Sequence, residues 1–425
     1  MPQRIPRAAA VWVALAAAVP RLGVLAIERG SILQEYVEKS DRFAKTLVDS
    51  GTFGFLPGVP SAYTQPLYAW LLAGVYWPFG RSWVAVGLMQ IALAVVTALL
   101  VLAIGTRLGG ARVGVVAALI TTLHPYLVWH DVHVNRELVD GLLLAAITLL
   151  ALVAYERRSA WYAIATGAVL GLAILGNSRL ILLPLWLAPY LVWRLRPRGR
   201  AVAVALTVCV AAGAVVAPWA IRNKAQLGCF TITTDARALW KANNPHTYAI
   251  LANGGWIDDV PELPGVPPWP EKAAEEALAT GKPVPVDECA QMRFYQDQVK
   301  TFWREHPGEK LKLSAQATRM LWSPFLSVKA DDAGQQGLSD FAQRTIEPLF
   351  ALLLYALAIA GAFFAPRRYV VLAALLLTYN TIAAMVFAGT IRYRVPWDFV
   401  LAVLAGFALV RGWERLKGYR ASRAS

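Results

Sequence analysis

Three acidic residues in the stretch 33–48 are the first candidates for chemistry. If the stretch is helical, Leu33 and residues at three- and four-residue steps after it form an apolar stripe. At about 100° per residue, Asp41 falls at the border of this stripe and Glu38 further into the polar face. A carboxylate at a lipid-facing cleft can take a proton from an acceptor hydroxyl or amine. The alternative is a solvated helix with pairs four residues apart: Glu35–Lys39, Glu38–Arg42 and Asp41–Lys45.

A second polar group surrounds residues 130–140, just before and within an apolar run. Asp131-Val132-His133 has the residue types that ligate a divalent metal, although two ligands in one turn are a weak signal. The alternative for the histidines is interfacial packing and hydrogen bonding. Glu137 and Asp140 open the apolar run, where acids also serve as caps and partners of the helix dipole. An ionisable residue that enters the membrane still merits a functional hypothesis.

The third group is basic and consists of Arg179, Arg222, Arg392 and Arg394, all near the ends of apolar runs. A guanidinium binds phosphate in a bidentate manner, so these residues are candidates to hold an anionic ligand such as a lipid phosphate. The alternative is pairing with lipid headgroups or with the carboxylates described above.

The elements that must position these groups are membrane spans. A chain of 425 residues with 57% hydrophobic and 16% charged residues is typical of a polytopic all-α membrane protein. Apolar length and charge alternation together predict ten spans. They lie near residues 8–27, 82–104, 113–129, 138–155, 161–176, 180–194, 201–220, 348–365, 369–388 and 396–412.

The distribution of charge fixes the predicted topology. Six short segments between the spans carry seventeen Lys or Arg and two Glu, whereas the whole chain has a net charge of +14. The basic residues therefore follow the positive-inside rule and do not indicate a nucleic-acid partner. Both termini are predicted to be cytoplasmic. Pro66–Phe79 is too short for a span, and counting it as one would move every later arginine cluster outside. We expect it to be an interfacial helix, as we do for the stretch before it.

The predicted outer face receives the first loop (28–81), two short turns, the long segment 221–347 and residues 390–395. The long segment contains Pro-rich turns and helix-like pieces near Glu271–Thr280 and Cys289–Arg304, which suggests a small lid. Cys229 and Cys289 both fall in it and can form a disulfide if it is extracytoplasmic, but nothing in the sequence fixes their distance. We therefore divide the chain into a transmembrane module (1–220), this segment, and C-terminal helices with a basic tail (348–425).

The order of several short motifs resembles that of the GT-C membrane glycosyltransferases of family 39, the protein-mannosyltransferase type, with aminoarabinose transferases as relatives. The resemblance runs through nearly the whole chain and depends on order and spacing more than on any single motif. The matching stretches are Ala44–Leu47 to Gly51–Gly54, Gln65–Tyr68, Phe79-Gly80, His124-Pro125, Arg136-Glu137, Pro218–Asn223, Asn243–Pro245 and Arg392–Pro396.

The resemblance implies a GT-C fold and sugar transfer, with inversion, from a polyprenyl-phosphate carrier to an acceptor that the sequence does not identify. The catalytic Asp of the family falls at the position of Tyr36 in this sequence. We expect Asp41 to replace it, with Glu38 as the next candidate, and Glu137 to match the family's second-loop acid. We expect Arg222, Arg392 or Arg394 to hold the carrier phosphate, with Arg179 nearby. Asp131 and His133 are similar to a metal motif of related oligosaccharyltransferases, so a divalent metal is the one cofactor left open.

Two other classes of function compete with this hypothesis. A transporter of lipid-linked saccharides should carry charged or broken helices at mid-membrane, whereas the polar groups here gather at one predicted face. A non-catalytic relative that binds a lipid-linked glycan, or an envelope scaffold, is favoured by Tyr36. Family resemblance and charge topology together predict a bacterial inner-membrane protein whose site faces the periplasm.

Overall fold

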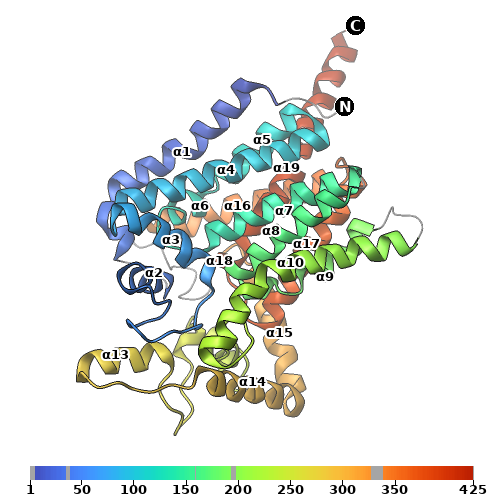
Figure 1. Cartoon of the computed structure of the whole chain (residues 1–425). Coiled ribbons are helices and arrows are strands. Elements are labelled where there is room, and N and C mark those ends of the chain that lie inside the picture. Colours follow the sequence, from blue (N-terminus) through green and yellow to red (C-terminus); the bar gives the residue numbers. More distant parts are fainter. Residues whose placement is uncertain (1–4, 35–38, 158, 193–197, 327–337, 425) are drawn as a thin grey trace.

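The protein folds as a bundle of long helices (Figure 1), known from a computed structural model that describes residues 5–34, 39–157, 159–192, 198–326 and 338–424. Within these residues the only β pairing is an isolated bridge between Leu56 and Val59. The prediction of an all-α polytopic protein is confirmed.

Seven helical stretches of the described chain are long and apolar enough to cross a membrane. They are Arg7–Leu33, which contains α1 (Arg7–Glu28), Trp83–Gly109 (α4), Glu137–Arg157 (α7), Val202–Leu227 in α10 (Arg198–Leu227), Ala342–Ala362, which contains α16 (Glu347–Ala362), Arg367–Val386 (α17), and Ile391–Lys417, which contains most of α19 (Asp398–Ala424). Three shorter apolar stretches occupy the other predicted spans: α5 (Ala111–Thr122), α8 (Ala160–Gly176) and Ser178–Val192, which contains α9 (Leu183–Val192).

The third predicted span, 113–129, is two helices instead of one. α5 ends at Thr122 and the short α6 (Pro125–His130) begins at Pro125. Proline has no N–H to donate to the preceding turn and its ring crowds that turn, so the helix breaks there. The 12 residues of α5 are fewer than the roughly 20 that a span requires.

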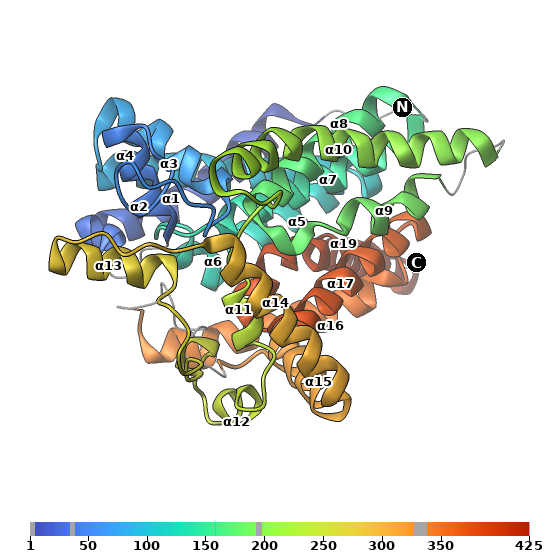
Figure 2. The ribbon, with the colours of Figure 1, turned by 60° about the horizontal axis from the view of Figure 1, so that its bottom comes forward.

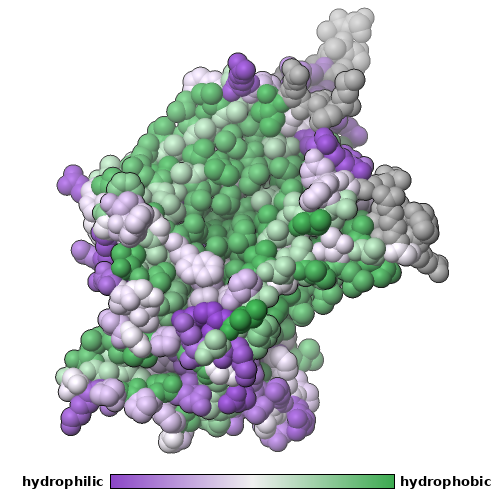
Figure 3. Space-filling view, viewed as in Figure 1, coloured by the Kyte–Doolittle hydropathy of each residue, from purple (hydrophilic) through white to green (hydrophobic). Residues whose placement is uncertain are grey.

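The loops that were predicted to be cytoplasmic meet at one end of the bundle. Glu156, in the last turn of α7, pairs with Arg107 at the end of α4 and with Arg368 at the start of α17, the latter at 2.9 Å. Both chain ends lie at the same end of the molecule, away from α13 and α14 (Figure 1). One face of the bundle presents a broad apolar surface, and hydrophilic residues gather below it (Figure 3). This arrangement supports the predicted alternation of the loops.

Glycines allow close packing of α8 against α10. A Cβ at Gly167 would lie 2.4 Å from the carbonyl oxygen of Val208, and one at Gly171 would lie 2.6 Å from that of Ala212. Small residues of this kind let helix backbones approach closely inside a membrane, where packing replaces the hydrophobic effect as the driving force.

The first loop contains two helices, as predicted, but Leu33, where the first was expected to begin, belongs to a different element. The chain forms a 3₁₀ turn at Arg29–Leu33 that continues from α1, and the described part of α2 spans Lys39–Ser50. α3 (Pro66–Phe79) packs against α2. Its Trp77 is 82% exposed, as suits an aromatic side chain at a membrane interface.

The segment 221–347 contributes a small helical subdomain (Figure 2), which lies at the end of the molecule opposite the two chain ends (Figure 1). Its described helices are α11 (Arg237–Lys241), α12 (Thr247–Ala252), α13 (Pro270–Thr280), α14 (Glu288–Glu305) and α15 (Pro307–Trp322). α13 and α14 match the two helix-like pieces expected from the sequence. Cys229 and Cys289 form a disulfide between the end of α10 and the start of α14.

The subdomain is fastened to the first loop by polar contacts. The carboxylate of Glu288 accepts hydrogen bonds from the backbone N–H of Ala62, at 3.0 Å, and from the hydroxyl of Thr234, at 2.6 Å. Lys39 forms an ion pair of 3.2 Å with Asp235. The first loop and the 221–347 segment therefore cover the same end of the bundle.

Candidate functional site

Asp41 is enclosed by two partners from the second half of the first loop. It lies in the first turn of α2 and is 5% exposed. The hydroxyl of Tyr76 donates to its carboxylate at 2.5 Å, and the Nε of Arg81 lies 2.9 Å from the same oxygen. Burial, together with the charge of Asp41, raises the pKa of Tyr76 well above its ordinary value, so the phenol keeps its proton. Glu38, Glu35 and Tyr36 lie outside the described residues.

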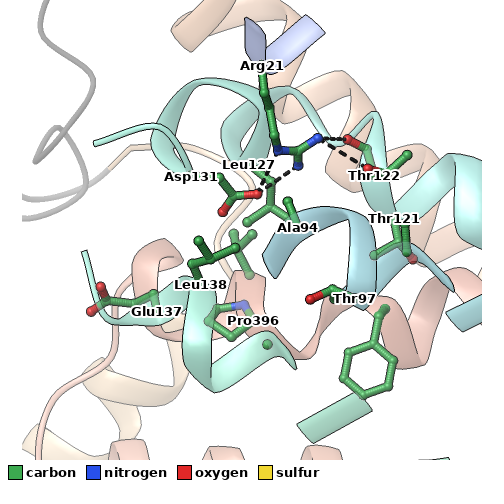
Figure 4. A pocket seen from close by; sticks show the side chains of 14 residues that line it. Arg21, Ala94, Thr97, Thr121, Thr122, Leu127, Asp131, Glu137, Leu138 and Pro396 are labelled. Atoms are coloured by element: carbon green, nitrogen blue, oxygen red, sulfur yellow. Dashed lines mark hydrogen bonds and ion pairs between the residues drawn. The ribbon is translucent and has the colours of Figure 1, made fainter. Parts of the chain in front are cut away.

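Asp131 and His133 turn toward different partners. Oδ2 of Asp131 accepts from Nε and Nη2 of Arg21, at 3.0 and 2.7 Å, in the interior of the bundle (Figure 4). The ring of His133 contacts the carbonyl of Trp129 through Nδ1, at 3.1 Å, and its Nε2 lies 3.6 Å from Glu28. Across the described part of the chain, no three His, Cys, Asp or Glu side chains are grouped to hold a metal ion. The geometry therefore gives the weak metal prediction no support.

Glu137 and Arg392 form a buried ion pair at the start of α7. The Nε of Arg392 lies 2.7 Å from Oε1 of Glu137, whose side chain is 4% exposed. The pair joins the start of α7 to the short helix α18 (Ile391–Arg394), and the two residues are 255 positions apart in the sequence. In Figure 4, Glu137 lies apart from the Arg21–Asp131 pair, at the other side of the cavity that they line.

Arg179 lies next to this pair and is incompletely satisfied. A niche of about 10 Å³ is lined by Glu137, Asp140, Asn177, Arg179 and Tyr393 together with apolar residues. The guanidinium of Arg179 stacks over the ring of Tyr393, at 4.1 Å from its centroid. Its Nε and Nη2 are buried and have no hydrogen-bond partner among the described residues. A buried cation without hydrogen-bond partners is costly, and this cost is repaid if a ligand supplies the acceptors.

The other two arginines of the predicted phosphate site do not reach this niche. Arg222 donates to the backbone carbonyls of Ser61, at 2.9 Å, and Phe53, at 3.1 Å, and so ties the first loop to α10. Arg394 donates to Asp398, at 3.2 Å, and to the carbonyl of Ser323, at 2.7 Å. The structure separates the predicted set into Arg179 and Arg392 beside the niche and two arginines that connect segments of the fold.

Two further polar residues that line the niche, Asp140 and Asn177, were not predicted as site residues. Asp140 lies one turn after Glu137 on α7, and its Oδ2 accepts from the side-chain amide of Asn177 at 2.8 Å. Gln65, from the first loop, does not line the niche but contacts residues next to it, because it donates to Ser178 at 3.0 Å and accepts from Arg136 at 2.7 Å. The sequence signal for Asp140 was its place at the start of a span, but Asn177 carried no such signal.

The helical bundle defines a polytopic membrane protein, and the likeness to solved structures given below identifies the fold as GT-C. Residues 60–221 match the family described as dolichyl-phosphate-mannose-protein mannosyltransferase. No curated protein matches the sequence.

Three solved structures are similar to this chain, and the two with TM-scores of 0.52 and 0.50 show the likeness of fold. Oligosaccharyltransferase AglB from Archaeoglobus fulgidus, in complex with an inhibitory peptide and a dolichol-phosphate, matches with a TM-score of 0.52 at 12% identity, over 98% of this chain and 51% of that one. The apo oligosaccharyltransferase from the same organism matches with a TM-score of 0.50 at 13% identity, over 97% and 52%. ArnT from Cupriavidus metallidurans in the apo state matches with a TM-score of 0.38 at 15% identity, over 95% and 78%.

This chain spans about half the length of the archaeal oligosaccharyltransferases, at 52% and 51% of those chains. At such identities the likeness establishes the fold. Together with the family match it confirms the resemblance to GT-C membrane glycosyltransferases that the sequence motifs indicated.

Proposed function

We propose that the protein is an integral membrane glycosyltransferase that moves a sugar from a polyprenyl-phosphate carrier to an extracytoplasmic acceptor. The observation that carries the proposal is the niche at the outer end of a GT-C bundle, where Arg179 has buried donors without hydrogen-bond partners in the described structure. The family match over residues 60–221 supports a polyprenyl-phosphate donor, as does the dolichol-phosphate bound to AglB.

In this proposal the carrier phosphate binds to Arg179 and Arg392 while the polyprenyl chain lies between spans. A carboxylate takes the proton of the acceptor hydroxyl or amine, and the acceptor attacks the anomeric carbon. The bond between that carbon and the phosphate oxygen breaks, and the arginines stabilise the charge left on the phosphate. The resemblance implies one displacement with inversion.

The base remains to be assigned among the acidic candidates. Glu137 borders the niche and is paired with Arg392, so a phosphate that draws Arg392 away would raise the proton affinity of this carboxylate. Asp41 does not line the niche and is held by Tyr76 and Arg81. We therefore rank Glu137 above Asp41 as the base, and keep Glu38 as a third candidate.

The proposed location is the inner membrane of a bacterium, with both termini cytoplasmic and the niche facing the periplasm. The acceptor, which can be a lipid, a glycan or a protein, would enter beneath the 221–347 segment. We retain the division into a transmembrane module (1–220) with a catalytic first loop (28–81), this segment, and the C-terminal helices (348–425).

The test is a transfer assay with purified protein in lipid, a panel of radiolabelled polyprenyl-phosphate sugars and a crude envelope fraction as acceptor. We expect transfer by the wild type, its loss in Glu137→Gln and its retention in Asp41→Asn. Loss in Asp41→Asn alone would return the base to the first loop. Repeating the assay with EDTA tests whether transfer requires a metal.

A second candidate function is a non-catalytic relative that binds a lipid-linked glycan. Tyr36 at the position of the family's catalytic Asp favours it, as does the enclosure of Asp41. Carrier binding without transfer from any donor, by protein shown to be folded, would support this candidate over the enzyme.

A further inference from the structure

The niche beside Arg179 contains a second incompletely satisfied group of opposite charge. Asp140 is 4% exposed, and Asn177 occupies only its Oδ2. Its Oδ1 is buried without a hydrogen-bond partner in the described part of the molecule. Buried carboxylate oxygens are normally hydrogen-bonded, so an unoccupied one in a lined niche requires an explanation.

Asp140 and Arg179 do not satisfy each other although both line the same niche. No ion pair within 4.0 Å joins them, and the unpartnered atoms are an acceptor on one side and two donors on the other. A molecule that satisfies both must carry an anionic oxygen for the guanidinium and, close to it, a hydrogen-bond donor for the carboxylate. A single water can fill a space of this size but brings no anionic charge to Arg179.

The adjacent backbone keeps the space beside Oδ1 open. Gly176 directly precedes Asn177, and a Cβ built on it would lie 3.8 Å from Oδ1 of Asp140 and 3.3 Å from a methyl carbon of Leu67. A methyl group here is therefore nearly tolerated by the fold, but it would occupy the space that a ligand group needs to reach the carboxylate.

We propose that Asp140, positioned by Asn177, accepts a hydrogen bond from the sugar hydroxyl next to the anomeric carbon of the carrier, and so selects the sugar. This assignment rests on the proposed function, because it takes the phosphate on Arg179 as given. A glycosyl phosphate places its 2-hydroxyl beside its phosphate, which is the required pairing of donor and anion. The niche is small, about 10 Å³, so it receives this one hydroxyl, while the phosphate on Arg179 and the rest of the sugar lie at its border.

The test measures the binding of three probes to the full-length protein in lipid nanodiscs. The probes are undecaprenyl phosphate, the undecaprenyl-phosphoryl sugar that the wild type binds best among glucose, galactose, mannose and arabinose, and the 2-deoxy form of that sugar carrier. The variants are Asp140→Asn and Gly176→Ala, with Thr148→Val, further along α7, as the matched control.

If Asp140 accepts this hydrogen bond, the wild type and Thr148→Val should bind the sugar carrier about ten- to a hundredfold more tightly than its 2-deoxy form. This ratio of affinities is what a hydrogen bond to a charged group contributes. Asp140→Asn and Gly176→Ala should lose this preference and keep the affinity for undecaprenyl phosphate. An unchanged preference in both variants would overturn the assignment, as would an equal loss of all three probes in Asp140→Asn, which would make Asp140 a structural residue. Wild-type protein that binds undecaprenyl phosphate without any such preference contradicts this assignment alone. Wild-type protein that binds none of the probes contradicts the proposed function as well.

Discussion

The substitution Arg179→Met should remove carrier binding without destabilising the protein. A buried polar group without a hydrogen-bond partner costs about 1–3 kcal/mol, and more if it is charged. Nε and Nη2 of Arg179 are in this position among the described residues. The guanidinium lies 4.1 Å from the ring centroid of Tyr393, and this stacking stabilises the folded protein by about 2 kcal/mol when the pair is desolvated. It therefore offsets part of that cost. Methionine keeps a favourable contact with that ring. We therefore expect the free energy of unfolding to stay the same or to rise by up to about 2 kcal/mol.

The same substitution should weaken carrier binding by about a hundredfold or more. Hydrogen bonds between charged groups contribute about 1.5–3 kcal/mol each, and two donors of Arg179 are available to a phosphate. Losing about 3 kcal/mol corresponds to slightly more than a hundredfold in the dissociation constant. The assay is the binding of undecaprenyl phosphate in nanodiscs, paired with urea unfolding of the ligand-free protein.

Arg394→Met is the matched control, because Arg394 is buried but fully engaged. It is 1% exposed and donates to Asp398 and to the carbonyl of Ser323. Its removal leaves Asp398 without its guanidinium partner, which should cost about 3–5 kcal/mol of stability. Carrier affinity should be retained under conditions where the variant is folded. The reasoning is refuted if Arg179→Met destabilises the protein as much as Arg394→Met does, or if its carrier affinity stays within threefold of the wild type.

Three further predictions concern stability. Replacing Cys229 and Cys289 by serine should destabilise the 221–347 subdomain by about 4 kcal/mol, because the disulfide closes a loop over a separation of 60 residues. Hydrogen exchange on α14 should accelerate in this variant, and an unchanged exchange rate would contradict the prediction. Burial lowers the pKa of Lys310 to about 8, so above pH 8 and up to about pH 10.4 the unfolded chain holds a proton that the folded protein has released. The melting temperature of the wild type relative to Lys310→Met should therefore rise with pH in that window, and a flat difference would show that the amine is solvated. Arg21→Met should cost about 3–5 kcal/mol because it strands Asp131, whereas adding Asp131→Leu should restore most of the urea midpoint; no recovery in the double variant would refute the pairing.

The spans and the convergence of the outer loops could be predicted from the sequence. Apolar length reports membrane insertion directly, and the arginine-rich loops determine which loops share an end. The pairing of Glu156 with Arg107 and Arg368 shows that three of the loops predicted to share an end of the bundle do so. The border position of Asp41 on a helix predicted that it could leave water, and it is buried. The break of the third span at Pro125 was also visible in the sequence, but apolar length alone concealed it.

The partners of the site residues could not be predicted, because they come from distant segments. Tyr76 and Arg81 reach Asp41 from 35 and 40 residues further along the chain. Arg222 is bound by backbone carbonyls, which every residue possesses and no motif marks. Asn177 lies 37 residues from Asp140, and only the packing of α7 beside α8 brings them together. Side-chain type therefore identified candidates, whereas tertiary packing decided which arginines keep donors available for a ligand.

The central claim is that the bond between the sugar and the carrier phosphate breaks on this protein. The most direct measurement uses an undecaprenyl-phosphoryl sugar labelled with ³²P in the phosphate and ¹⁴C in the sugar, incubated with the protein in lipid and an envelope fraction. The account predicts that ¹⁴C passes to the acceptor while ³²P is recovered as undecaprenyl monophosphate, and that both changes stop in Arg179→Met. Both labels remaining together on a carrier that the protein nevertheless binds would contradict the account and identify a binding protein instead.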